Sequence, residues 1–204
     1  MATKKQVEIA LSKLEVFDNP KVNLEQYSTP SSIASDMLWN MHMQNDCGVI
    51  ADFGCGSGIL GFGALLLGVK KCYFIDKDEE AIEIALKNRI KLEEEFEVRF
   101  DCEFVISDVA IFNNNVDIVV MNPPFGVQRE HADKVFLESA FKVANVIYSF
   151  HKTESRKFLE SICKDNGFEI THVWNYTFPL KPTMEHHTQK KYEVDVICVR
   201  LKKI

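Results

Sequence analysis

Short apolar runs alternate with amphipathic segments along most of the chain. The apolar runs have the length and composition of buried strands, and we expect such strands at residues 48–53, 71–75, 118–121 and 145–150. Between them apolar side chains recur every three or four residues, which predicts helices at residues 59–67, 79–95, 133–144 and 155–164. This alternation indicates an α/β fold with a mostly parallel, doubly wound sheet.

Both ends of the chain depart from that alternation. Two helices come first, at residues 4–16 and from about residue 31, where Thr29 or Ser31 is a candidate N-cap. Two strands come last, at residues 170–178 and 192–201, and predict a closing antiparallel pair. We therefore expect one domain over residues 1–204, in which residues 1–45 form a helical cap and residues 46–204 form the sheet core.

Residues 98–106 alternate between apolar and polar side chains at first. Val98, Phe100, Cys102 and Phe104 fall on one side of the predicted strand. The polar residues Arg99, Asp101 and Glu103 fall on the other side. This period of two is typical of a strand that is buried on one face, as at the edge of a sheet.

Composition excludes several classes of protein. The chain is 46% hydrophobic with 15 Phe, so it can fill a core, and none of its apolar runs could span a membrane. No apolar segment follows the N-terminal lysines, so we expect no signal peptide. Six scattered cysteines without a CxxC pair favour reduced thiols in the cytoplasm, or in the nucleus for a eukaryotic protein, and no metal site.

Charge is unevenly distributed along the chain. The net charge is −6 overall, and residues 76–103 alone contribute −6. Residues 181–204 carry a net +3 together with two adjacent histidines. A basic C-terminal segment is compatible with a local nucleic-acid contact and equally with an ordinary solvated surface.

A glycine-rich turn, Gly54-Cys55-Gly56-Ser57-Gly58, follows the first predicted strand. Residues 56–61 formally match the dinucleotide fingerprint G-x-G-x-x-G, and Asp76 lies about twenty residues further on. Asp52 ends the strand beside this turn, however, and a carboxylate is unfavourable next to a pyrophosphate but favourable next to a cation. The residues therefore favour a ligand with an amino group and a sulfonium.

A second turn, Asn122-Pro123-Pro124-Phe125, follows the apolar run at residues 118–121. The two prolines have no backbone N–H and cannot continue a central strand, so the strand ends at Asn122. Asn122 and Phe125 are then presented at the carboxyl end of a strand, where open α/β sheets bind ligands. The alternative is a simple turn in which Asn122 caps the backbone and Phe125 fills the core.

Together these motifs resemble the S-adenosylmethionine-dependent methyltransferases of the Rossmann-like class, over nearly the whole chain. The resemblance implies that residues 52–58 bind the methionine part, that Asp76 binds the ribose, and that Asp108 and Val109 bind the adenine. Asn-Pro-Pro-aromatic after the fourth strand marks, in that class, methyl transfer to a planar nitrogen. Asn122 and the Pro123 carbonyl would then hold the amine, and Phe125 would stack on a base.

Three segments sharpen the resemblance: residues 24–30, residues 122–126 and residues 148–152. Together they are similar to a group of small archaeal and eukaryotic enzymes that make N6-methyladenosine in small-subunit ribosomal RNA. In that group the cofactor contacts would be Gln26, Thr29, Asp52, Gly54, Gly56, Ser57, Gly58, Ile59, Asp76, Asp108 and Val109. The resemblance also implies a structured RNA substrate and, in eukaryotes, a small zinc-binding activator subunit, for which the Val98–Phe104 edge is the candidate docking strand.

The RNA clamp implied by the resemblance lies in the loop between the last two strands. Its candidate residues are Lys181, His186, His187, Lys190 and Lys191. Other acceptors remain open with the same Asn-Pro-Pro-Phe turn, namely a protein glutamine amide and guanine N2. A catalytically silent RNA-binding scaffold and, more remotely, a nicotinamide oxidoreductase are the alternatives of other classes.

Overall fold

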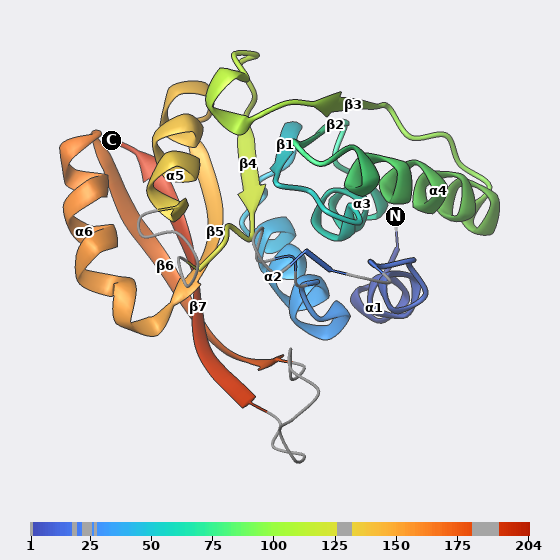
Figure 1. Ribbon diagram of the computed structural model, residues 1–204, viewed down its shortest axis with the longest axis horizontal. Helices are drawn as coiled ribbons and strands as arrows, with labels where there is room; N and C mark the ends of the chain where they lie inside the picture. The colour runs from blue at the N-terminus through green and yellow to red at the C-terminus, as the bar shows by residue number, and fades with distance from the viewer. Residues whose placement is uncertain (1, 18–19, 22–25, 27, 126–131, 181–191) are drawn as a thin grey trace.

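The computed structural model describes residues 2–17, 20–21, 26, 28–125, 132–180 and 192–204. Within these residues seven strands form one sheet in the order β3-β2-β1-β4-β5-β7-β6 (Figure 1). The strands are β1 (Val49–Phe53), β2 (Lys71–Asp76), β3 (Cys102–Ile106), β4 (Ile118–Met121), β5 (Val146–Lys152), β6 (Phe168–Leu180) and β7 (Tyr192–Lys203). The α-helices are α1 (Lys4–Ser12), α2 (Ser31–Met43), α3 (Ile59–Leu66), α4 (Glu79–Phe96), α5 (Ala132–Val143) and α6 (Arg156–Asp165).

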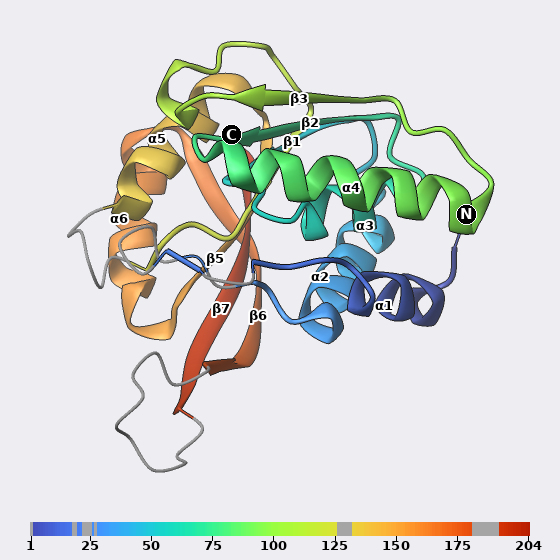
Figure 2. The same cartoon turned by 45° about the vertical axis from the view of Figure 1, so that its right-hand side comes forward.

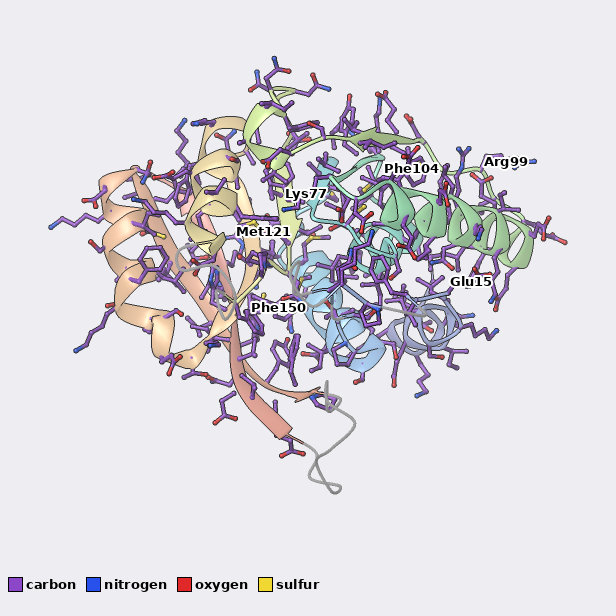
Figure 3. All side chains as sticks on the ribbon, viewed as in Figure 1. Glu15, Lys77, Arg99, Phe104, Met121 and Phe150 are labelled. Atoms are coloured by element: carbon purple, nitrogen blue, oxygen red, sulfur yellow. The ribbon has the colours of Figure 1, made fainter. Side chains whose placement is uncertain are left out.

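The sheet confirms the predicted fold class. Strands β1 to β5 pair in parallel, whereas β7 runs antiparallel to both β5 and β6. The strand order reverses at β1, which has β2 on one side and β4 on the other. Such a reversal leaves a crevice at the carboxyl ends of the two central strands, which here end at Phe53 and Met121. Figure 3 shows Met121 near the middle of the molecule.

The helices form one layer on each face of the sheet (Figures 1 and 2). Helices α1 to α4 share a buried cluster with one face, in which Leu38 and Phe62 are fully buried. Helices α5 and α6 share a second cluster with the opposite face, around Leu137 and Leu159. Burial on both faces explains why the central strands read as continuous apolar runs.

The two N-terminal helices pack against α3, and α2 is also bonded to β6, where the Tyr176 hydroxyl donates to Asp36 at 2.8 Å. Val7 and Leu11 of α1 belong to the same buried cluster as Leu38 of α2. Helix α1 ends at Ser12, four residues before the predicted end. Helix α2 has Pro30 at its N-cap without a side-chain cap hydrogen bond, so the expectation that Thr29 or Ser31 caps it is wrong.

The strand expected from residue 98 begins only at Cys102, and this part of the prediction is wrong. Helix α4 ends where Glu97 adopts a left-handed conformation (φ 52°), and the chain then folds back on the helix. The carboxylate of Glu93 accepts hydrogen bonds from the Phe100 N–H at 2.9 Å and from the Arg99 guanidinium at 2.7 Å. Arg99 lies at the far end of α4 (Figure 3). Phe100 packs against the first core cluster, whereas Val98 is exposed, and β3 itself is an edge strand, as predicted.

The last two strands are longer than predicted and extend beyond the body of the molecule (Figures 1 and 2). The five candidate RNA-clamp residues, Lys181, His186, His187, Lys190 and Lys191, lie outside the described residues. In the part of the chain that is described, no helix is long and apolar enough to cross a membrane.

Candidate active site

One pocket opens at the carboxyl ends of β1, β2, β3 and β4. Twelve of the fifteen predicted catalytic and cofactor residues line it: Gln26, Thr29, Asp52, Gly54, Gly56, Ser57, Ile59, Asp76, Asp108, Val109, Asn122 and Pro124. The other three, Gly58, Pro123 and Phe125, are next to lining residues in the chain but are not part of the lining. The structure thus brings residues that are up to 98 positions apart in the sequence, from Gln26 to Pro124, around a single space.

The turn after β1 is shaped by three glycines with positive φ, at +65° for Gly54, +52° for Gly56 and +82° for Gly58. Gly58 is the N-cap of α3, and a Cβ atom there would lie 2.5 Å from the ring of Phe62. Gly58 therefore supports the pocket through its conformation and its close packing on α3. Residues 54–57 of the turn line the pocket next to the N-terminus of α3, with the Cys55 N–H bonded to the Ile75 carbonyl oxygen and the Gly56 N–H bonded to Asp76.

Asp52 is a buried acid at the end of β1, with only 1% of its surface exposed. Its Oδ2 accepts a hydrogen bond of 2.8 Å from the Gly61 N–H in the first turn of α3. Burial raises the pKa of Asp52 to about 7, and the neighbouring charge of Asp76 adds to the rise, although the Gly61 bond opposes it. The pocket therefore contains a carboxyl group that changes its charge near neutral pH.

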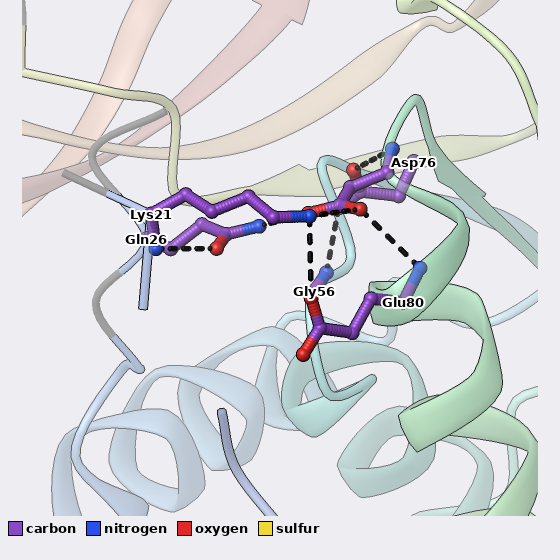
Figure 4. A network of polar contacts seen from close by, with 6 residues as sticks. Lys21, Gln26, Gly56, Asp76 and Glu80 are labelled. Atoms are coloured by element: carbon purple, nitrogen blue, oxygen red, sulfur yellow. Dashed lines mark hydrogen bonds and ion pairs between the residues drawn. The ribbon is translucent and has the colours of Figure 1, made fainter. Parts of the chain in front are cut away.

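Asp76 is the last residue of β2, and both of its carboxylate oxygens accept hydrogen bonds from backbone N–H groups. Its Oδ2 accepts from the Gly56 N–H at 3.0 Å and its Oδ1 from the Asp78 N–H at 2.9 Å (Figure 4). Burial raises the pKa of Asp76 above its usual value, whereas these two bonds lower it. Each carboxylate oxygen keeps a further lone pair, so a rigidly held acid can still accept hydroxyl groups from a ligand.

Asp108 follows β3 at the next position around the pocket. It is the N-cap of the short 3₁₀ helix η2 (Val109–Ile111), and its Oδ1 accepts from the Ala110 N–H at 2.9 Å. The cap bond fixes the carboxylate, and both Asp108 and Val109 line the pocket. The predicted adenine-binding pair therefore lies together, at the third of three successive strand ends.

Several described residues between α1 and α2 line the pocket or are bonded to residues around it. We call the described residues 14–17, 20–21, 26 and 28–29 the strap. Lys21 Nζ lies 2.8 and 2.7 Å from the two carboxylate oxygens of Asp78, and Gln26 Nε2 donates to Asp78 Oδ2 at 2.7 Å (Figure 4). Burial alone would raise the pKa of Asp78, but the bonds from Lys21 and Gln26 hold it below its usual range. Glu80 adds a second ion pair with Lys21 at 3.2 Å.

A buried asparagine on α4 joins the strap to the glycine turn. Asn88, with 0% exposure, accepts from the Glu15 N–H at 2.8 Å and donates to the carbonyl oxygens of Glu15 and Ser57, both at 3.0 Å. Sequence reasoning missed Asn88, Lys21 and Asp78 as parts of the site. A polar residue at a buried position of an amphipathic helix is the signal by which Asn88 could have been noticed.

The Asn122 side chain lies at the end of β4 with its amide turned towards the strap. Its Nδ2 donates to Thr29 Oγ1 at 3.0 Å. Its Oδ1 is buried and has no hydrogen-bond partner among the residues that the structure describes. Phe125 packs at the edge of the first core cluster, with its ring centroid 6.2 Å from that of Phe178 and the two rings inclined by 56°. A buried acceptor that lacks a partner is unfavourable unless a ligand supplies the donor.

Two aromatic side chains also line the pocket and were not predicted. Phe136 of α5 lies against Gly54, where a Cβ atom would be 3.0 Å from the Phe136 ring. Phe17 of the strap lies against Gly56, at 3.6 Å from such a Cβ atom. Within the described residues no group of His, Cys, Asp or Glu could hold a metal ion.

Known proteins that are similar to this chain include methyltransferases and a methyltransferase candidate, in agreement with the geometry of the pocket. The family model of the methyltransferase small domain matches residues 30–148, which is more than half of the chain. The chain is 35% identical to an uncharacterized protein of Methanocaldococcus jannaschii, over 100% of this chain and 96% of that protein. It is 32% identical to the rRNA N(6)-adenosine-methyltransferase METTL5 of Danio rerio, over 96% of this chain and 97% of that protein. The crystal structure of an RNA methyltransferase candidate from Pyrococcus horikoshii superposes with a TM-score of 0.88 and 42% identity, over 100% and 99% of the two chains.

Proposed function

The chain belongs to the methyltransferase small domain family, and we propose that it transfers a methyl group from S-adenosylmethionine to the N6 amine of an adenosine in ribosomal RNA. The buried Oδ1 of Asn122, without a partner among the described residues, is the observation that carries the proposal. Full-length similarity to an rRNA N(6)-adenosine-methyltransferase supports the choice of acceptor. Small-subunit RNA is the substrate we expect, on the resemblance of residues 24–30, 122–126 and 148–152.

The pocket has the donors and acceptors that S-adenosylmethionine needs. Asp76, held by two backbone N–H groups, would accept the ribose hydroxyls, and Asp108 with the Val109 backbone would receive the adenine. The glycine turn and Asp52 would hold the methionine part, where a carboxylate stabilises the positive charge. When bound, the cofactor supplies an electrophilic methyl group on a sulfonium.

The Asn-Pro-Pro-Phe turn would hold the acceptor amine. An exocyclic amine shares its lone pair with the ring and is a poor nucleophile. Two acceptors, Asn122 Oδ1 and the Pro123 carbonyl, would each take one amine N–H, direct the nitrogen at the methyl group and favour its pyramidal form. Phe125 would offer a ring face to a base that has been turned out of its stack, a contact of about 1–3 kcal/mol in comparable sites. Positioning and electrostatics would then carry the reaction with no obvious general base: the amine nitrogen would bond the methyl group as the bond from that group to sulfur breaks, and the methylated amine would release its extra proton to solvent.

Recognition of the RNA would extend beyond this pocket. We propose that residues 181–191 contact the RNA backbone through Lys181, Lys190 and Lys191, with His186 and His187 beside them. We propose also that a small activator subunit can pair with the free edge of β3, at Cys102–Ile106, since an edge strand offers unpaired backbone groups. The helical cap of residues 1–45 would act with the sheet core as one domain, because α1 and α2 share their buried cluster with the sheet.

The test is radiolabelled methyl transfer, with small-subunit ribosomal RNA and a release factor offered side by side. We expect label in N6-methyladenosine after nucleoside digestion of the RNA. Asn122→Ala should abolish transfer while cofactor affinity by calorimetry stays within about threefold, because the lost group contacts the acceptor. Asn114→Ala, in an exposed loop, is the matched control and should retain full activity.

Other outcomes of this assay would favour one of the alternative functions. Label in the release factor alone would contradict the RNA assignment and favour a glutamine amide. Label in guanosine would shift the acceptor to guanine N2. Tight cofactor binding without transfer to either substrate, with and without an activator subunit, would favour the scaffold.

A further inference from the structure

Thr29 is the strap residue that lies closest to the acceptor side of the pocket. It is buried, with 4% of its surface exposed, and it lines the same pocket as Asn122. Its neighbour Pro30 is the N-cap of α2, and that N-cap has no side-chain hydrogen bond. The Thr29 hydroxyl is therefore not used to cap the helix that follows it. It reaches instead to the end of β4, 93 residues away in the sequence, where it accepts the 3.0 Å bond from Asn122 Nδ2.

That bond places Nδ2 of Asn122 on Thr29 and leaves Oδ1 as the end of the amide that is available to a substrate. The two ends of a carboxamide have nearly the same shape but opposite hydrogen-bonding character. With Nδ2 on Thr29, the remaining end is Oδ1, which is buried and has no partner among the described residues. An amine acceptor has N–H groups to donate, so it needs Oδ1. If Nδ2 faced the amine, two donors would oppose each other and the amine would not be held.

Thr29 is held in place from both sides along the chain. On its C-terminal side, the carbonyl of Pro30 accepts from the N–H groups of Ile33 and Ala34 at 3.0 and 2.8 Å, so α2 begins directly after it. On its N-terminal side, Gln26 is bonded to Asp78 at 2.7 Å, beside the acid proposed to bind ribose. The hydroxyl is thus presented by a segment with two fixed points, and its direction is set by the fold.

We propose that Thr29 is a positioning residue for methyl transfer, whose hydroxyl holds the Asn122 amide so that Oδ1 meets the acceptor amine. This inference rests on the proposed function and deepens it. The resemblance implies a cofactor contact for Thr29, whereas the hydrogen bond gives it a role on the acceptor side. The two roles predict different kinetic consequences, because one acts on cofactor binding and the other on the chemical step.

The test compares Thr29→Val, which replaces the hydroxyl by a methyl group of similar size, with Thr29→Ser, which keeps the hydroxyl. With cofactor and RNA both saturating, we expect kcat of Thr29→Val to fall on the order of 10- to 100-fold, because the amide is no longer oriented. Thr29→Ser should stay within about threefold of the wild type. The dissociation constant of S-adenosylhomocysteine, measured by calorimetry, should change by less than about threefold in both variants, which also reports on folding.

A second readout needs no methyl transfer. In ¹⁵N-labelled protein, the Nδ2 protons of Asn122, assigned by their loss in Asn122→Asp, should exchange slowly with solvent in the wild type and in Thr29→Ser. They should exchange faster in Thr29→Val. The exchange measurement separates the proposed RNA methylation from the positioning role of Thr29. If the wild type methylates no RNA, the proposed function fails, but the exchange rates still decide whether Thr29 orients the Asn122 amide.

Three results would overturn the inference. One is weaker cofactor binding in Thr29→Val with unchanged kcat at saturation, which would make Thr29 a cofactor contact alone. Another is an equal loss of kcat in Thr29→Ser and Thr29→Val, since the hydroxyl would then not be the cause. The last is unchanged exchange of the Asn122 Nδ2 protons in Thr29→Val.

Discussion

Asp52 should make cofactor binding depend on pH in a way that can be calculated. The pKa of this carboxyl is raised to about 7, chiefly by burial, so about half of the free protein carries a proton on Asp52 at pH 7. A cationic ligand beside Asp52 favours the ionised form. Binding at or below pH 7 must therefore release a proton from this group.

The size of the effect follows from the pKa. Complete ionisation on binding would release about 0.9 proton at pH 6, about 0.5 at pH 7 and less than about 0.1 above pH 8. The logarithm of the association constant should rise by about one per pH unit below pH 7 and level off above pH 8, which is about 1.4 kcal/mol for each unit. In the absence of ligand, the contribution of Asp52 to the free energy of unfolding changes with pH in the opposite direction, falling as the pH rises. Because the folded pKa lies above the unfolded value, the contribution of Asp52 is present below about pH 4 and is lost as pH rises to about 7.

The assay is isothermal titration calorimetry with S-adenosylmethionine at pH 6, 7 and 8.5, in two buffers that differ in ionisation enthalpy. The difference in observed heat between the buffers gives the number of protons released. Asp52→Asn is the matched control, since it has the same shape but cannot ionise. We expect the difference between wild type and Asp52→Asn to be close to one proton at pH 6 and to vanish at pH 8.5. Equal proton release in the two proteins at pH 6 would refute the reasoning, because Asp52 would then already be ionised in the free protein.

Three further substitutions test other parts of the site. Asp76→Ala should weaken cofactor binding by about tenfold or more, since charged hydrogen bonds of about 1.5–3 kcal/mol are lost, and unchanged affinity by calorimetry would contradict the ribose assignment. Asn88→Leu should lower the free energy of unfolding by about 3 kcal/mol, because it removes three hydrogen bonds of a buried side chain, including both backbone bonds to Glu15; urea denaturation measures this, and a change under about 1 kcal/mol would contradict it. Gly58→Ala should destabilise the protein by about 2–3 kcal/mol, because alanine is strained at φ +82° and its methyl group would meet the ring of Phe62; a melting temperature equal to that of the wild type would contradict this.

The parts of the site that sequence reasoning found are those encoded locally. The glycine turn, the acids at the ends of three strands and the Asn-Pro-Pro-Phe turn each follow an apolar run, and parallel strands bring their carboxyl ends together. Once the alternation of strands and helices was recognised, their convergence on one pocket followed. The same local logic failed at residues 98–101, where a period of two predicted a strand. There the Glu93 carboxylate captures the Phe100 N–H and holds the segment on the end of α4.

The parts that sequence reasoning missed depend on contacts between distant polar residues. Lys21 and Asp78 are 57 positions apart, and nothing in either neighbourhood marks the pair. Phe136 looks like any apolar residue of an amphipathic helix, yet its ring covers Gly54. For Thr29 the local pattern was misleading, because a threonine before a proline-initiated helix is typical of an N-cap. Only the fold reveals that its hydroxyl is used elsewhere.

The described residues of the strap are bonded to both halves of the pocket. At residue 15 it is bonded to Asn88, which also holds the carbonyl of Ser57 in the glycine turn. At residues 21 and 26 it is bonded to Asp78, and at residue 29 to Asn122. A displacement of the strap therefore alters the cofactor half and the acceptor half together. It follows that a substitution at Lys21, remote from the amine, should affect kcat as well as cofactor affinity, whereas one in the β6–β7 hairpin should affect RNA binding alone.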